Sequence, residues 1–496
     1  MRISLAYWVL ATGVCFGQTS FGDIENRISD FTLGNGMKFI TYEKNLAPVV
    51  SFRTYADVGS AQDPPDGAGL AHMFEHMAFK GTSTLGTTNY GAEKMALEKV
   101  EAAAAALREG RRMGNADKAQ LSRLEAALQS AQDEAEKYVV PLAYAAAIEG
   151  AGGRGLNATT SQDGTSFYYN LPSNATELWF FLESHRFSDP VFRQFYKERS
   201  VVMQERRLRV EDNALGKLFE TFLATAFQIH PYGRPVLGKI SELDNLTRSG
   251  AEAFFHKYYQ ASNLTAAIVG NVNAQTVKRL AQEYFGPLPA SPKPTPLTLE
   301  EPRQTSERSV TVHLAAQRIV CMGYHRPELN HPDSAAYEVL NGLLIQGRSA
   351  RFNRELLDRG VITRLQGLVT YPSGKYPNLM VFCMNPAPGR SNDEAADAAA
   401  AIFERIKADG VTDEEVSGAK ARFRAAFLYQ LKDNPAIASQ LAQWQAMTGS
   451  WRNLFRYLER VAAVKPEDVR MVARKTLNRD NMTVAKIEPI VTGATQ

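Results

Sequence analysis

Strand-like apolar runs stand near the beginning of each half of this 496-residue chain. Residues 47–58 (APVVSFRTYADV) and 309–324 (SVTVHLAAQRIVCMGY) are rich in the β-branched and aromatic side chains that favour strands. Each half closes in the same order, with a helix, a short polar turn that contains an asparagine, and an apolar strand, at residues 254–272 and 471–489. The repeated order predicts an α+β fold of two related domains.

A proline-rich segment separates the two halves. Residues 286–302 (GPLPASPKPTPLTLEEP) contain six prolines, which exclude a helix or a central strand and favour an extended connector. We therefore expect a linker over residues 286–304, with one domain at residues 27–285 and a second at residues 305–496. The chain is also longer than one hydrophobic core usually organises, which agrees with two domains.

The first domain is longer than the second because of residues 93–140. This tract is rich in Ala, Leu, Glu, Lys and Gln, all good helix formers, and it has a turn signal at Gly114–Asn115. It predicts two antiparallel helices, an inserted helical hairpin. The simplest interpretation is a solvated excursion without a function of its own, and a contact with a partner is the alternative.

Composition excludes one class of function. Apolar residues make up 44% of the chain, charged residues 22%, and the formal net charge is +3. Charges of both signs are mixed along the chain, so no basic surface for tracking phosphates is indicated. We expect a globular protein that does not bind nucleic acid.

The first residues indicate export. Residues 1–20 begin with Arg2 and continue with the apolar run Ile3–Phe16, which is too short to span a bilayer as a mature helix. We interpret them as an export signal peptide, which predicts a periplasmic or secreted protein without a transmembrane segment in the mature chain. An uncut N-terminal anchor is the alternative. Cys15 suggests a lipid anchor, but Val14 fits that cleavage site poorly.

Two cysteines remain after such cleavage, Cys321 and Cys383. Each lies in an apolar, strand-like run, where a free buried thiol is as common as a disulfide. The sequence therefore leaves their pairing open. We expect the hydrophobic cores, without a disulfide framework, to stabilise the fold.

Candidate chemistry lies in residues 69–82 (GLAHMFEHMAFKGT), which hold two of the eight histidines. If this stretch is helical, His72 and His76 lie one turn apart on one face. Zinc accepts two such imidazoles, and a catalytic zinc site keeps one position open for water. Glu75 would lie on a neighbouring edge of that face and reach the water without binding the metal. A packed structural pair is the alternative, which the specific HxxEH spacing argues against.

A third ligand must come from elsewhere in the sequence. The best candidates are Glu198 and Glu205 in residues 196–213 (YKERSVVMQERRLRVEDN), seven residues apart and thus on one face of a helix. Either could bind a metal. On an arginine-rich helix, however, such a pair is more often part of a salt-bridged surface.

HxxEH followed by Glu–x6–Glu on a helix resembles the inverted-zincin metallopeptidases of the pitrilysin and insulinase family, which includes mitochondrial processing peptidase. The resemblance implies one zinc ion per chain, bound by His72, His76 and Glu205. It implies that Glu75 is the general base and that Glu198 supports the site. It also implies domains with mixed or antiparallel sheets flanked by helices, which face each other across a cleft like a clamshell.

Further runs resemble the same family across most of residues 27–290 and, more loosely, the second half. They are GAGLAH, GLNATTSQDGTSFYYNLP, LESHRFSDPVF, HPYGRPVLG and YYQASNLTAAIVGNV. The gap between HxxEH and the ligand glutamate is longer than is usual in the family, and the hairpin at residues 93–140 accounts for the excess. The second run resembles the strand on which the family holds a substrate as an added β-strand, and we predict a substrate contact at Asn157.

The sequence departs from the family in the second half. Self-sufficient members carry an Arg and a Tyr seven residues apart that reach toward the substrate, and here the best register places Leu356 and Thr363 at those positions. Arg364 and Tyr371 have the right separation but fall in the next predicted strand. We therefore expect a homodimer or heterodimer in which a subunit of the same family supplies Arg and Tyr.

The resemblance implies a zinc-dependent endopeptidase that hydrolyses peptides or unfolded segments. Two alternatives belong to other classes. The chain could be a catalytically inactive structural subunit of the same fold, which the complete set of four site residues argues against. It could also be a zinc hydrolase that acts on something other than peptides, which a screen of peptides against small esters and amides would address.

Overall fold

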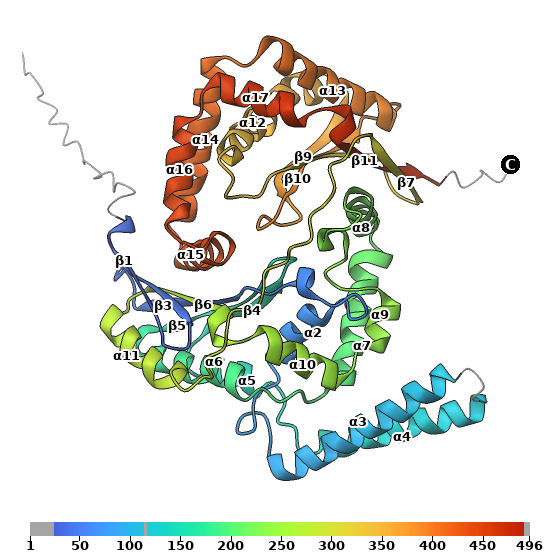
Figure 1. The fold of residues 1–496 in the computed structure, drawn as a ribbon, viewed down its shortest axis with the longest axis vertical. Helices are drawn as coiled ribbons and strands as arrows, with labels where there is room; N and C mark the ends of the chain where they lie inside the picture. The colour runs from blue at the N-terminus through green and yellow to red at the C-terminus, as the bar shows by residue number, and fades with distance from the viewer. Residues whose placement is uncertain (1–23, 114–116, 491–496) are drawn as a thin grey trace, which may run out of the picture.

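Two β-sheets organise the computed structural model, which describes residues 24–113 and 117–490 (Figure 1). The first sheet has six strands in the spatial order β1-β2-β6-β3-β5-β4. Its strands are β1 (Ile28–Thr32), β2 (Lys38–Glu43), β3 (Val49–Ala56), β4 (Arg154–Thr160), β5 (Thr165–Pro172) and β6 (Leu264–Gly270). Strands β2 and β6 run parallel and the other neighbours run antiparallel, so the sheet is mixed.

The second sheet has five strands in the order β7-β11-β8-β10-β9. Its strands are β7 (Arg308–Leu314), β8 (Ile319–Arg326), β9 (Ile362–Tyr371), β10 (Asn378–Pro386) and β11 (Met482–Pro489). Strand β11 pairs parallel with β7, and the other pairs are antiparallel. Order and directions repeat those of β2-β6-β3-β5-β4, so the expectation of two related α+β domains is confirmed.

Helices flank both sheets (Figure 1). Those before the linker are α2 (Leu70–Met77), α3 (Tyr90–Arg112), α4 (Lys118–Glu136), α5 (Ala143–Gly150), α6 (Thr176–Ser188), α7 (Phe195–Arg206), α8 (Ala214–Ala226), α9 (Ile240–Asn245), α10 (Arg248–Tyr258) and α11 (Ala274–Phe285). Those after it are α12 (Ser334–Ile345), α13 (Asn392–Asp409), α14 (Asp413–Gln430), α15 (Asn434–Thr448), α16 (Asn453–Ala463) and α17 (Pro466–Thr476). Most of them lie on the outer sides, whereas α8 and α15 lie between the sheets.

One helix of each domain packs on the sheet of the other domain. Helix α8 contacts β7 and β11 of the second sheet, and α15 contacts β3 and β6 of the first. Phe222 of α8 lies so close to β8 that a Cβ added at Gly323 would stand 2.3 Å from its ring. Leu441 and Trp444 of α15 share an apolar core with Tyr42 of β2. Helix α8 is the third α-helix after β5, and α15 is the third after β10. The two domains therefore each place the corresponding helix on the sheet of the other.

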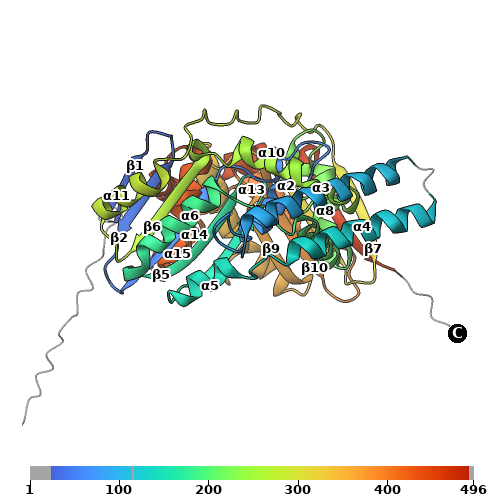
Figure 2. The same ribbon diagram turned by 90° about the horizontal axis from the view of Figure 1, so that it is seen from below.

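The predicted helical hairpin is present as α3 and α4, and it projects from the body of the molecule (Figures 1 and 2). Asn89 caps α3 by accepting a hydrogen bond from the backbone of Ala92, and Asp117 caps α4 in the same way through Gln120. The predicted turn at Gly114–Asn115 lies outside the described residues.

Residues 286–304 form neither helix nor strand. The linker at these residues and the domain limits at residues 27–285 and 305–496 remain predictions. The predicted signal at residues 1–20 lies outside the described residues. In the described part of the chain, no helix combines the length and the apolar character needed to cross a membrane.

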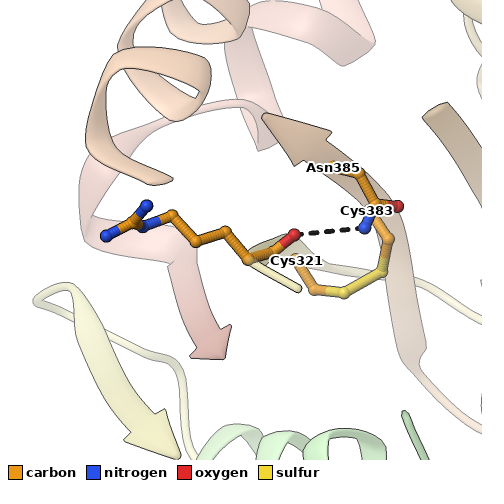
Figure 3. Close-up of a disulfide and its surroundings, with 4 residues drawn as sticks. Cys321, Cys383 and Asn385 are labelled. Carbon is orange, nitrogen blue, oxygen red and sulfur yellow. Dashed lines mark hydrogen bonds between the residues drawn. A yellow bond between two sulfur atoms is a disulfide. The ribbon is translucent and has the colours of Figure 1, made fainter. Parts of the chain in front are cut away.

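Cys321 and Cys383 form a disulfide between β8 and β10 (Figure 3). The sequence left this pairing open, and the structure resolves it as a disulfide, because the antiparallel pairing of these strands places the two cysteines directly opposite each other. The bond lies in the apolar core beneath α8. Two residues along β10, Asn385 donates a hydrogen bond to the carbonyl oxygen of Arg318 at 3.1 Å. A cross-link between residues 62 positions apart stabilises the domain by restricting its unfolded chain.

Candidate metal centre

Helix α2 begins at a fixed point in the first domain. Gly69 precedes it with φ +98°, a conformation that favours glycine, and Asp63 accepts hydrogen bonds from the backbone N–H groups of Gly69 at 2.7 Å and Ala71 at 2.9 Å. The apolar side chains of α2 are buried, among them Met73 and Phe74. Core packing and the cap together fix the rotation of α2 and the direction in which its histidines point.

Three predicted ligands come together. Nε2 of His76 lies 3.3 Å from Oε2 of Glu205, and Nε2 of His72 lies 3.7 Å from the same oxygen. The ligand atoms of the three residues all lie within 4.8 Å of one another. Tetrahedral ligands about 2.1 Å from a zinc ion stand about 3.4 Å apart, so the donor set and its spacing fit this metal.

Glu198 lies on the other side of His76. Its Oε2 is 3.3 Å from Nδ1 of His76, and its Oε1 accepts a hydrogen bond from Nζ of Lys80 at 2.5 Å. When Nδ1 of His76 donates to a carboxylate, Nε2 keeps the lone pair that a metal needs. Glu198 is therefore placed to orient His76, while Glu205 faces both imidazoles.

Glu75 lies next to the three ligand candidates but is held by a different element. Thr160, at the end of β4, donates a hydrogen bond from Oγ1 to Oε2 of Glu75 at 2.6 Å. This bond fixes one carboxylate oxygen and leaves the other to accept a proton. Nothing in the sequence singled out Thr160, because the contact joins positions 85 residues apart.

The groups of the site shift one another's pKa. Burial, together with the neighbouring His76, lowers the pKa of His72 to about 4, so this imidazole is neutral near pH 7. Burial also lowers the pKa of His76, but hydrogen bonds to Glu198 and Glu205 outweigh this effect and raise the pKa of His76 to about 9. Burial raises the pKa of Glu75. Shifted groups of this kind gather at functional sites.

A cavity of about 280 Å³ lies beside the site. Asn157 lines it together with Glu75, His76 and Glu198, so the predicted contact residue lies where a substrate could reach it. Its apolar walls are Phe79, Val139, Val140, Pro141, Leu142, Ala143 and Ala158. Asn157 belongs to β4, the edge strand of the first sheet.

The residues that stand where the family has its Arg and Tyr lie in the second domain. Leu356 is buried, and Thr363 is exposed on β9. Arg364 and Tyr371 are also on β9, opposite Asn385 and Leu379 of β10. Those two partners are six positions apart, so Arg364 and Tyr371 face the same side of the sheet.

The second domain, as far as residue 490, carries no equivalent ligand set. Helix α12 holds the place of α2 in the repeat, and its sequence SAAYEVLNGLLI has no histidine. Across residues 24–113 and 117–490, the cluster of His72, His76 and Glu205 is the one group of three or more potential ligands that converges.

Known proteins share this architecture. The zinc protease PqqE of Helicobacter pylori is 24% identical over 466 residues, which cover 92% of this chain and 92% of that protein. The crystal structure of a protease from Helicobacter pylori matches with a TM-score of 0.76 at 23% identity, over 93% of this chain and 99% of that one. The first half of the periplasmic protease PqqL from Escherichia coli matches with a TM-score of 0.67 at 17% identity, over 93% and 92%.

Family profiles match both halves. The profile of the insulinase family, peptidase family M16, matches residues 38–129 and 131–239, which include the whole candidate centre. A profile described as the peptidase M16 inactive domain matches residues 245–423, in agreement with the missing ligands of the second domain. Since the two profiles together match most of the sequence, the chain belongs to the insulinase family of peptidases, family M16.

Proposed function

We propose that the chain is a zinc-dependent endopeptidase. One observation carries the proposal: two imidazole nitrogens of α2 and a carboxylate oxygen of α7 converge at the spacing of a tetrahedral zinc site, with Glu75 beside them. His72, His76 and Glu205 would bind one zinc ion. The names of relatives described as zinc proteases support the same conclusion.

Each residue then has a defined part in hydrolysis. Bound zinc supplies Lewis acidity, which polarises a carbonyl group and makes water more acidic. Glu75 takes a proton from the attacking water and passes it to the leaving amine. Thr160 holds the Glu75 carboxylate in place, and Glu198, beside Nδ1 of His76, would leave Nε2 of that ring to bind the metal.

The substrate would be an extended peptide. Strand β4 is an edge strand, and its residue Thr160 contacts Glu75 directly, so a peptide added along β4 would carry its backbone past the general base. Asn157 would contact that peptide. Backbone pairing of this kind tolerates many sequences, and the apolar wall of the adjacent cavity would favour an apolar side chain.

Removing the metal tests the proposal directly. Dialysis against a chelator is expected to end cleavage of an unfolded polypeptide, and one equivalent of zinc per chain is expected to restore it. Peptide cleavage is followed by mass spectrometry, with small esters and amides assayed in parallel. Cleavage that survives complete metal removal contradicts the proposal, and activity on esters alone points to the third class of function.

The structural alternative is an inactive subunit of the same fold, as the name of the domain matched by the second half permits. A scaffold needs neither the convergent ligands nor a fixed carboxylate beside them. The described first domain has both, which favours the enzyme.

We further propose that the protein is exported and works in the periplasm or outside the cell. The sequence of residues 1–20, the disulfide between Cys321 and Cys383, and a periplasmic relative from Escherichia coli support this compartment.

The chain is expected to cleave peptides slowly as a monomer, because Leu356 has no side-chain donor and the short hydroxyl of Thr363, which donates to the backbone carbonyl of Asn385 at 3.4 Å, cannot replace a Tyr. A second subunit of the family, either another copy or a different chain, would supply them. The measurement is turnover against oligomeric mass. Full turnover by a monomer, unchanged by Arg364→Ala and Tyr371→Phe, would contradict the paired arrangement.

A further inference from the structure

The helical hairpin is joined to the metal centre by a continuous chain of hydrogen bonds. Both carboxylate oxygens of Glu136, the last residue of α4, accept from Nε2 of Gln194 at 2.8 Å. The Oε1 of Gln194 accepts from Nζ of Lys80 at 3.1 Å, and Lys80 donates to Glu198 at 2.5 Å. Glu198 contacts Nδ1 of His76 at 3.3 Å. Four contacts therefore connect an element outside the sheet to a zinc ligand.

Backbone strain gathers at the same place. Gln194 has φ +59° and Leu142 has φ +54°, and they are the two non-glycine residues with positive φ in the described part of the chain. Both line the cavity beside His76. Left-handed conformations are costly for side chains other than glycine and persist where the surroundings enforce them. Gln194 immediately precedes α7, and Leu142 lies just beyond the hairpin.

A buried ion pair fixes the base of the hairpin. Glu93 on α3 pairs with Arg193, and both side chains are inaccessible to solvent apart from 1% of Arg193. The guanidinium of Arg193 also donates to the backbone carbonyls of Lys80, Thr82 and Leu85. Arg193 is the neighbour of Gln194 in the chain, and its guanidinium binds the carbonyl of Lys80. Through Glu93, the hairpin therefore holds the backbone next to both residues of the Gln194–Lys80 contact.

Beyond this base the hairpin contacts the body through Val100 and Ala104 of α3, which belong to the core of the first domain, and through an ion pair of Arg111 with Asp244 of α9 at 3.4 Å. A cavity of about 590 Å³ lies between its two helices and α7, lined by Leu107 and Leu128 on one side and Met203 on the other. The hydroxyl of Tyr196 donates to Glu101 across this gap at 2.8 Å. Polar contacts of this kind are remade more easily than a close-packed apolar core.

We infer that the hairpin is a positioning arm for the metal centre. Lys80 and Gln194 are positioning residues that transmit the place of Glu136 to Glu198, and through Glu198 to the ring of His76. The inference rests on the proposed zinc site and goes beyond it. A change that displaces the arm lowers the affinity for zinc, and by reciprocity zinc binding tightens the base of the arm.

Substitutions along the chain test this arm. Gln194→Gly removes the side chain but suits positive φ, so its stability is expected to equal or exceed that of the wild type while zinc affinity falls about tenfold. Glu136→Ala is expected to lower zinc affinity about threefold to tenfold. Glu136→Gln keeps an oxygen that can accept from Gln194 and is expected to keep most of the wild-type zinc affinity. Affinity is measured by competition with a chromophoric chelator and stability by thermal unfolding.

The matched control is Glu134→Ala. Glu134 lies in the same helix, its side chain is 41% exposed, and it pairs with Lys137, so zinc affinity is expected to stay unchanged. Equal zinc affinity of Gln194→Gly, Glu136→Ala and the wild type overturns the inference and leaves the zinc peptidase intact. A wild type that binds no zinc at all overturns the proposed function instead.

Hydrogen exchange of the unmodified chain gives a test that needs no variant. Zinc is expected to slow the exchange of backbone amides at residues 134–142, while amides near residue 120, at the far end of α4, stay unchanged. No slowing at residues 134–142 contradicts the inference, even where zinc is bound.

Discussion

Glu75→Gln is expected to lower the rate of peptide cleavage about a thousandfold while the zinc content stays the same. An amide cannot accept the proton of the attacking water, and general-base catalysis contributes about 10² to 10⁴ in rate. The amide keeps the size of the carboxylate, and its oxygen can still accept the hydrogen bond of Thr160. Glu75 is outside the converging ligand set, so the metal should remain bound. The measurement is kcat together with zinc per chain.

Glu149→Gln is the matched control for this result. Glu149 is an exposed glutamate of α5 in the same domain, and its loss of charge should change neither rate nor zinc content. If Glu75→Gln turns over at the wild-type rate, hydrolysis does not use this carboxylate and the mechanism is wrong.

Glu205→Gln is expected to have the opposite pattern, with loss of the metal itself. Removing the charged ligand leaves two imidazoles of α2, and zinc affinity should fall by more than about 100-fold, since changes outside the first ligand shell already cost about 10- to 100-fold. Cleavage should fall with zinc occupancy and recover in part when zinc is added in excess. Affinity is measured by chelator competition and occupancy by metal analysis after gel filtration.

Two further variants make this result specific. Glu211→Gln removes a nearby exposed carboxylate that pairs with Arg206, and zinc binding should be unaffected. Glu198→Gln should weaken zinc binding less than Glu205→Gln, because Glu198 contacts the ring of His76 from the side away from the metal. If Glu198→Gln weakened zinc binding more than Glu205→Gln, Glu198 would be the ligand. The sequence leaves this alternative open, because both glutamates lie on one face of the same helix.

Local patterns predicted the parts of the site that lie within single helices. The i, i+4 spacing of His72 and His76 and the i, i+7 spacing of Glu198 and Glu205 are properties of a helix, and α2 and α7 have them. The internal repeat was also visible, because its order of elements is local. The assignment of Glu205 over Glu198 came from family resemblance. Both carboxylates lie 3.3 Å from a nitrogen of His76, but Glu205 also lies 3.7 Å from His72, which favours it as the ligand.

Contacts between distant segments were beyond the sequence. Thr160 meets Glu75, and Gln194 links Glu136 to Lys80, only because β4 and the hairpin lie beside α2 in space. The pairing of Cys321 with Cys383 likewise depends on the register of β8 and β10. Along the chain, α12, a short helical turn and β9 lie between these two strands. Alternation along one strand fixes which face a side chain occupies but not its partner across the sheet.

The reciprocal packing of α8 and α15 has a consequence for how the molecule holds together. Separating the two halves would expose an apolar face of each sheet to water. The reason is that α15 of the second half covers the first sheet and α8 of the first half covers the second sheet. A protease that severed the proline-rich connector would therefore leave a nicked but intact particle. The side chains that α8 and α15 pack on the opposite sheets are therefore expected to keep the two halves together once the chain has folded.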